Sequence, residues 1–219
     1  MYRWSVEKAA EKLELPTLSI MIRRFLYDQL YPDSQIPSSQ LGITAYPKFN
    51  GTISIFCAAS AIYQAPSDVY SINGMHREYI RATPSWRGGS ARYNCVFVNS
   101  MPDFEGMSGF EIARVLAFFS FIHGDKEYQC ALIHWFSRVD NEPDEDTGLW
   151  KVEPEFNDGG QPFIDIIHID CIFRAAHLLP AFETEQYIST SLTMDDTLDT
   201  FKQFYVNRFV DYHAFEIAF

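Results

Sequence analysis

Four arginines and a tryptophan in one short window are the residues of this sequence best suited to bind a charged ligand. The arginines are Arg77, Arg81, Arg87 and Arg92, and Trp86 lies between the second and third of them. Guanidinium groups contact phosphate, and an aromatic ring offers a face on which a base can stack. The window therefore predicts a nucleic-acid-binding surface. The alternative is that these arginines pair with acidic residues of the same protein and that Trp86 covers its core.

A second pair of basic residues, Arg23 and Arg24, falls on a predicted helix. This helix is the second of two, as in a helix-turn-helix, so the pair is a further candidate for contact with DNA. Helical pairs of this length are common, however, and the other charges of the segment nearly cancel. Packing inside the protein is the alternative role for these two arginines.

Residues that could bind a metal ion are spread along the second half of the chain. His168, Asp170, Cys171 and His177 are the right types to bind a transition metal, but the alternation of residues around them also fits a strand. The acidic segment 140–146 could attract a divalent cation, because hard cations prefer clustered carboxylates. It lacks the glycine spacing of a calcium loop, and its composition is typical of a solvated turn between strands.

Catalytic patterns are also weak. A two-metal nuclease needs three carboxylates on separate elements, and no spacing selects the nominees Asp165, Asp170 and Glu153. The sequence contains no glycine-rich phosphate loop, no nucleophile elbow and no zinc-protease motif. We therefore expect no enzymatic activity, no bound metal and no cofactor.

Composition favours a protein with one substantial core and an acidic surface. The chain has 219 residues, is 47% hydrophobic and carries a net charge of −12, so a nucleic acid cannot be wrapped by the whole surface. The first hundred residues hold slightly more basic than acidic side chains, so a polyanion would meet that part. Four isolated, apolar-flanked cysteines predict buried, reduced thiols: Cys57, Cys95, Cys130 and Cys171. We expect an intracellular protein, because neither a signal peptide nor a membrane-spanning apolar run is evident.

The beginning of the chain is predicted to be helical. Residues 5–14 place apolar side chains at helical spacing, with Ser5 as N-cap, and Pro16 opens a second helix that stops at Pro32. Prolines and serines then indicate an ordered linker. We expect a helical hairpin over 1–31, a linker over 32–50 and a mainly antiparallel β domain over 51–219.

Segments rich in β-branched and aromatic residues predict the strands of the β domain. We expect residues 74–91 to form a loop that leads into a strand at Tyr93–Asn99, because Pro84 and Gly88-Gly89 interrupt regular structure. Residues 204–218 fit a strand or a helix equally. Further strands are expected over 52–63, 110–123, 128–139, 149–152 and 163–170, with a short helix over 195–202.

These elements predict an α+β fold: an N-terminal helical hairpin, then a small, mostly antiparallel β-barrel with a short C-terminal helix. Hairpin connections between short strands favour a closed barrel over an open sheet. The strand order is also similar to that of a bromo-adjacent-homology (BAH) module, which is a likeness of fold only.

Several long segments carry a family resemblance. They include RWSVEKAAEKLELPTLSIMIRRFLYDQLYP, GMHREYIRATPSWRGGSARYNCVFVN, IIHIDCIFRAAHLLP and FYVNRFVDYHAFEIA. With these segments, nearly all of the chain resembles the C-terminal region of fungal Plavaka-type transposases, a CACTA-related family of mushroom-forming fungi. In that family a metal-dependent nuclease core of the DDE type precedes this region. The resemblance therefore implies a nuclear, DNA-transaction context and assigns no catalytic residue to this chain.

Two functions from different classes are predicted. The first is a non-catalytic C-terminal accessory module of a DNA transposase, or a decayed remnant of one, that contacts DNA or the missing nuclease core. The second is a stand-alone, BAH-like interaction domain that binds a chromatin protein. The arginine window favours the first function, and the overall acidity favours the second.

Overall fold

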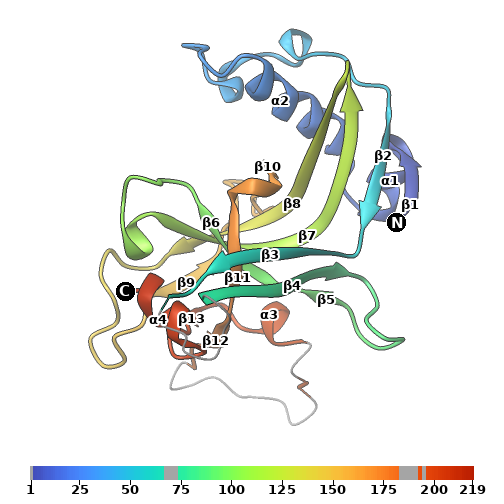
Figure 1. Cartoon of the computed structure of the whole chain (residues 1–219). Helices are drawn as coiled ribbons and strands as arrows, with labels where there is room; N and C mark the ends of the chain where they lie inside the picture. Colours follow the sequence, from blue (N-terminus) through green and yellow to red (C-terminus); the bar gives the residue numbers. More distant parts are fainter. Residues whose placement is uncertain (1, 67–73, 183–191, 194–195) are drawn as a thin grey trace.

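The computed structural model describes residues 2–66, 74–182, 192–193 and 196–219. The main sheet is antiparallel and strongly curled, and two helices near the N-terminus lie against one end of it (Figure 1). The predicted α+β class, with helices ahead of a mostly antiparallel sheet and a short C-terminal helix, is confirmed, but the sheet is a curled half-barrel and not the closed barrel that the sequence favoured. Among the helices described, none has the length and apolar character needed to cross a membrane.

The N-terminal helices form the predicted hairpin. α1 spans Val6–Lys12, and α2 spans Leu18–Leu30. Ser5 caps α1, because its hydroxyl accepts a hydrogen bond from a backbone amide in the first turn. A strand that the sequence did not predict, β1 at Tyr2–Ser5, precedes the helices and pairs with β2 at Thr52–Phe56.

A long hairpin organises the main sheet. Its strands are β7, Phe110–His123, and β8, Lys126–Arg138, which agree with the predicted pair. Gly124 makes the turn between them with a φ of 61°, a backbone conformation that glycine adopts without strain. The neighbours of the hairpin are β2 and β6 (Cys95–Asn99) beside β7, and β9 (Lys151–Pro154) and β10 (Ile164–His168) beside β8.

The main sheet curls because two strands that follow each other in the chain lie at its opposite ends. β11, Ile172–Ala176, pairs with β6, whereas β12, Leu178–Pro180, begins two residues later and pairs with β13, Phe204–Val206. β13 in turn pairs with β9. One apolar cluster fills the curl and takes Phe97 from β6, Phe136 from β8 and residues of every strand around it. This shared interior gives the sheet its barrel-like form.

The sequence left residues 204–218 open between a strand and a helix, and the structure contains one of each there. β13 is followed by α4, Tyr212–Ile217, whose N-cap Asp211 accepts a hydrogen bond from the amide of Ala214. The short helix α3 covers Thr197–Thr200, inside the predicted range.

A second, three-stranded sheet corrects the expectation for residues 74–91, of which only 84–91 form a loop. In the earlier part, exposed polar side chains alternate with buried ones such as Ile80 and Ala82. That period of two is typical of a strand, but the density of charge concealed it. The strands of this sheet are β3 (Ala58–Gln64), β4 (Met75–Thr83) and β5 (Arg92–Tyr93).

The helical hairpin and the main sheet share one core. Ile22 and Leu26 of α2 are fully buried in the same cluster as Phe121 of β7 and Tyr128 of β8. Figure 1 shows α2 beside the long β7–β8 hairpin. The division of the chain into a hairpin, a linker and a β domain stays a prediction.

Candidate nucleic-acid interface

Trp86 lies at the centre of a small basic cluster beside β4 and β5. The guanidinium carbon of Arg81 on β4 is 4.1 Å from the centre of the Trp86 ring, and that of Arg87 is 5.2 Å from it. Contacts between a guanidinium group and an indole face are attractive, because the ring carries negative charge on its faces. The structure thus brings together three residues of the predicted arginine window.

Arg92 belongs to the same cluster. It lies on β5 opposite Thr83 of β4 and is exposed. Loss of hydration lowers the pKa of Arg81 from its ordinary value, and the positive charges of Arg92 and Arg87 lower it further. Three guanidinium groups therefore repel one another in a small region. A phosphate bound there would relieve this repulsion and accept charge-assisted hydrogen bonds.

The loop over 84–91 that carries Trp86 is held by its own hydrogen bonds. The amide of Trp86 donates to the carbonyl of Ser90 at 3.0 Å, and the amide of Gly89 donates to the carbonyl of Trp86 at 2.9 Å. Arg87 has a φ of 53°, a left-handed backbone conformation that costs on the order of 1–2 kcal/mol for a residue with a side chain. Strain of this kind concentrates at functional sites. The loop extends away from the body of the molecule (Figure 1).

Arg77 lies farther along β4. It is on the same face as Arg81, because side chains two residues apart in a strand point the same way, and it is exposed. Every ion pair formed among the described residues involves a cation outside the arginine window, such as Arg114 or Arg174. Within the described ranges, the window arginines therefore form no ion pair with the acidic half.

Arg23 and Arg24 have a different role from the window arginines. Arg23 donates three hydrogen bonds, at 2.9–3.1 Å, to backbone carbonyls between residues 43 and 47. Arg24 donates to the hydroxyl of Ser38 at 3.2 Å. Both side chains thus attach the loop after α2 to that helix, which is the packing role considered as the alternative. They lie outside the candidate interface.

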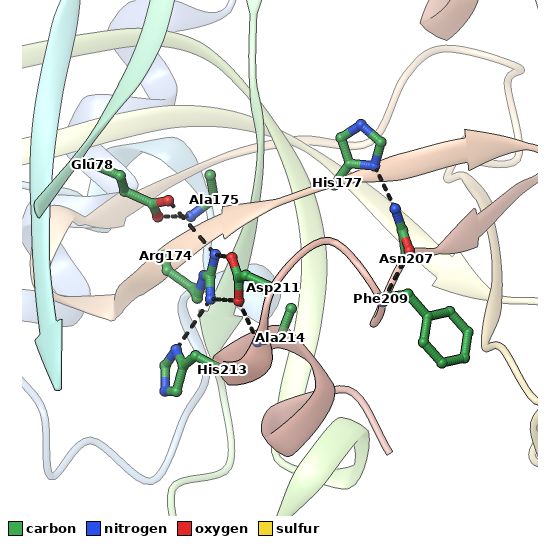
Figure 2. A network of polar contacts seen from close by, with 9 residues as sticks. All are labelled: Glu78, Arg174, Ala175, His177, Asn207, Phe209, Asp211, His213 and Ala214. Atoms are coloured by element: carbon green, nitrogen blue, oxygen red, sulfur yellow. Dashed lines mark hydrogen bonds and ion pairs between the residues drawn. The ribbon is translucent and has the colours of Figure 1, made fainter. Parts of the chain in front are cut away.

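A second polar centre, which no motif in the sequence indicated, surrounds the buried Arg174 of β11 (Figure 2). Its guanidinium group makes two hydrogen bonds with the carboxylate of Asp211 and lies 3.8 Å from the carboxylate of Glu78 on β4. It also donates to Nδ1 of His213 at 3.1 Å. Glu78 accepts a further hydrogen bond from the amide of Ala175. The network joins β4 and β11 to the beginning of α4.

Burial and Arg174 set the ionisation of this network. Burial raises the pKa of Glu78, although the Ala175 amide and Arg174 act against it. Burial also acts to raise the pKa of Asp211, but the hydrogen bonds from Arg174 and from α4 outweigh it and hold that pKa below its ordinary value. Burial and the charge of Arg174 lower the pKa of His213. Because these groups contact one another within the protein, the network has a structural role.

The residues considered for metal binding do not converge. His168 lies 3.2 Å from Asp170, whereas His177 contacts the side chain of Asn207 at 3.0 Å. Within the described ranges, no group of three or more His, Cys, Asp or Glu side chains is placed to hold a metal ion.

The carboxylates nominated for nuclease chemistry are engaged separately. Asp165 accepts a hydrogen bond from the adjacent backbone amide, and Glu153 accepts one from a glutamine side chain. In the acidic segment 140–146, Asp144 accepts two hydrogen bonds from Thr147, which lower its pKa to about 2. This segment forms an exposed turn between β8 and β9, as its composition predicted.

The cysteines agree with the prediction at two positions. Cys95 and Cys130 are buried, and burial raises the pKa of Cys95 to about 12 and also raises the pKa of Cys130. Cys171 is half-buried, and its pKa is raised by burial. The prediction is wrong for Cys57, which is exposed at the point where the chain leaves β2 and enters β3 of the other sheet. The alternation of inward-facing and outward-facing side chains is interrupted at this point.

Comparisons with protein-family models, with curated proteins and with solved structures found no match to this chain. The relation to Plavaka-type transposases and the likeness to a BAH module therefore stay predictions. The geometry of the Trp86 cluster is the strongest guide to function.

Proposed function

We propose that this chain is a non-catalytic accessory module that contacts DNA phosphates through Arg81, Arg87 and Arg92 around Trp86. The observation that carries the proposal is the packing of two guanidinium groups on Trp86 beside a third, in a chain with a net charge of −12. Holding these cations together costs free energy that a bound phosphate offsets. Contacts of this type position a protein on DNA without reading base sequence.

The sequence resemblance supplies a context for this activity. A C-terminal module of a transposase, or the remnant of one, would meet DNA together with a separate nuclease core. DNA and that core are then the partners, and the location is nuclear. Arg77, exposed on the same face of β4 as Arg81, would extend the contact along the strand.

Salt dependence of DNA binding tests the proposal. Fluorescence anisotropy with a labelled DNA, measured over a series of salt concentrations, gives the slope of log affinity against log salt. Each phosphate contact contributes about 0.9 to that slope on duplex DNA and about 0.7 on a single strand. We expect Arg87→Ala combined with Arg92→Ala to flatten the slope by up to about two and to weaken binding similarly for all base sequences.

A matched control removes the same charge elsewhere. Lys48→Ala combined with Lys126→Ala removes two exposed lysines, one at the start of β8 and one next to Phe49, whose ring lies 6.3 Å from that of His123. This variant should keep the wild-type slope. An unchanged slope in the folded Arg87/Arg92 variant, checked by circular dichroism, would contradict the proposal.

A protein-interaction module remains the second candidate function, and one observation favours it. Large apolar side chains are exposed around α4, with Phe209 64%, Tyr212 63% and Phe215 48% accessible. Exposed apolar patches often mark sites of protein association. If DNA binding proves independent of the arginine cluster, this reading replaces the first, with a chromatin protein or the nuclease core as the partner.

A further inference from the structure

A hollow of about 470 Å³ lies directly beside the Trp86 loop. This volume is within the range of small-ligand sites, about 300–1,000 Å³. The residues that form its walls come from the loop, from β5, from β7 and from α3, and they include Trp86, Ser90, Arg92, Tyr93, Arg114 and Leu198. The hollow therefore combines two aromatic side chains with Arg114 and with Arg92, which is itself one of the proposed phosphate contacts.

The wall formed by Tyr93 is fixed in place. Tyr93 is half-buried and pairs with Ala82 across β4 and β5. The guanidinium carbon of Arg114 lies 5.6 Å from the centre of its ring. A ring held in this way can stack on a planar ligand with little loss of side-chain entropy.

The polar side of the hollow is fixed as well. Arg114 makes two hydrogen bonds with the carboxylate of Asp199 on α3, which joins β7 to that helix. Asp199 itself lies outside the residues that line the hollow, and its role here is to hold Arg114 in place. A fixed aromatic ring and a fixed guanidinium group thus lie close together in the walls of the hollow.

We infer that this hollow receives an unpaired base of single-stranded DNA while the arginines around Trp86 hold the adjoining phosphates. In a duplex the bases are paired and stacked, and their faces cannot enter a hollow beside an aromatic ring, whereas a single strand presents them freely. The inference rests on the proposed DNA contact and deepens it. It makes single-stranded DNA the preferred substrate of the surface.

Anisotropy with a labelled single strand and a duplex of the same length, at one salt concentration, tests the inference. We expect the wild-type chain to bind the single strand more tightly. Tyr93→Leu removes the stacking ring and should weaken single-strand binding by roughly five- to hundredfold. Its affinity for the duplex should stay close to that of the wild type.

Two further variants keep the test decisive if Tyr93→Leu fails to fold. Ala91→Leu adds bulk at an exposed position of the hollow and should lower the single-strand preference. Tyr212→Leu removes an exposed tyrosine of α4 and should leave the preference unchanged.

The outcomes separate the two proposals. If the Arg87/Arg92 variant loses salt dependence but the wild type binds both DNA forms equally, the DNA contact stands and the hollow is not a base site. Equal loss of single-strand and duplex affinity in Ala91→Leu also overturns the inference. If the arginine variant changes neither binding curve, the proposed function fails, and this inference fails with it.

Discussion

Arg174 shows how a buried charge can hold distant parts of a chain together. The residue is only 3% exposed, and its carboxylate partners come from β4 and from the start of α4. Replacing one member of such a group leaves an uncompensated charge in the interior, which typically costs about 3–5 kcal/mol. Arg81 and Arg87 differ in kind, because their charges face Trp86 and solvent and form no ion pair among the described residues. Burial thus separates a structural arginine from candidate ligand-binding ones.

Thiol reactivity tests the burial of single residues. We expect a thiol reagent to modify Cys57 quickly in the native protein, because this cysteine is exposed. Burial and raised pKa values slow the thiolate chemistry of Cys95 and Cys130. Cys57→Ser should abolish the fast phase, and denaturation should release four thiols in the wild type. Four fast thiols in the native protein would show that the core around Cys95 and Cys130 opens readily.

Among the elements, α2 depends most clearly on packing against the sheet. Leu26 is completely buried between the helix and the long hairpin, whereas Leu30 at the end of the same helix is 42% exposed. We expect Leu26→Ala to lower the free energy of unfolding by about 2–5 kcal/mol, since it removes contacts and leaves a cavity. Urea unfolding followed by circular dichroism measures this loss.

Leu30→Ala is the matched control on the same helix. As an exposed substitution it should change the free energy of unfolding by no more than about 0.5 kcal/mol. Equal effects of the two substitutions would mean that α2 does not share the core of the sheet and that the predicted hairpin is an independent unit.

The elements also show what the sequence could and could not reveal. α2 was predictable from its helical apolar spacing after Pro16. The β7–β8 hairpin was predictable from the dense apolar run between Gly109 and Gly124, although the periodicity of that run is ambiguous. β4 was not predictable, because its outward face carries Arg77 and Arg81 and its inward face begins with the polar residues His76 and Glu78. Those polar side chains turn inward toward groups on other strands. No local pattern contains that information.

At the scale of the whole molecule, the candidate site was predictable only in part. The arginine window contained Arg81, Arg87 and Arg92, which stay close because β4, the loop over 84–91 and β5 follow one another directly in the chain. The Arg174 network could not be found in this way, since Glu78 and Ala175 are 97 residues apart and only the curled sheet brings them together. The same holds for Arg114 and Asp199, which are 85 residues apart. Local chemistry is visible in sequence, and contacts across the fold are not.

The stability of the folded chain should depend on pH through His213, which lies where β4, β11 and α4 meet. Its imidazole accepts a hydrogen bond from Arg174 at 3.1 Å and stacks on Tyr63 with ring centres 4.7 Å apart. Protonation would place a second positive charge against Arg174. Burial and Arg174 therefore lower the pKa of His213 below its ordinary value of 6.5, and the folded state binds fewer protons than the unfolded state. Stability is then lost as pH falls through and below that ordinary value.

Other groups contribute to the same curve. Burial lowers the pKa of His134, so this residue acts in the same direction as His213. Glu78 acts in the opposite direction, because a raised pKa means that its contribution to stability is lost as pH rises. A substitution at His213 therefore reduces the dependence on pH without abolishing it.

Urea unfolding at about pH 5.5 and about pH 7.5, on either side of the ordinary histidine pKa, measures the effect. We expect the wild-type midpoint to be lower at the acidic pH and the difference to shrink in His213→Gln, whose amide oxygen can still accept from Arg174. His177→Gln, at an exposed residue that contacts Asn207, serves as the control and should keep the wild-type difference. If His213→Gln also keeps the wild-type difference between the two midpoints, then His213 takes up its proton in the folded protein without disturbing Arg174. The attachment of α4 to the sheet would then not depend on a neutral imidazole.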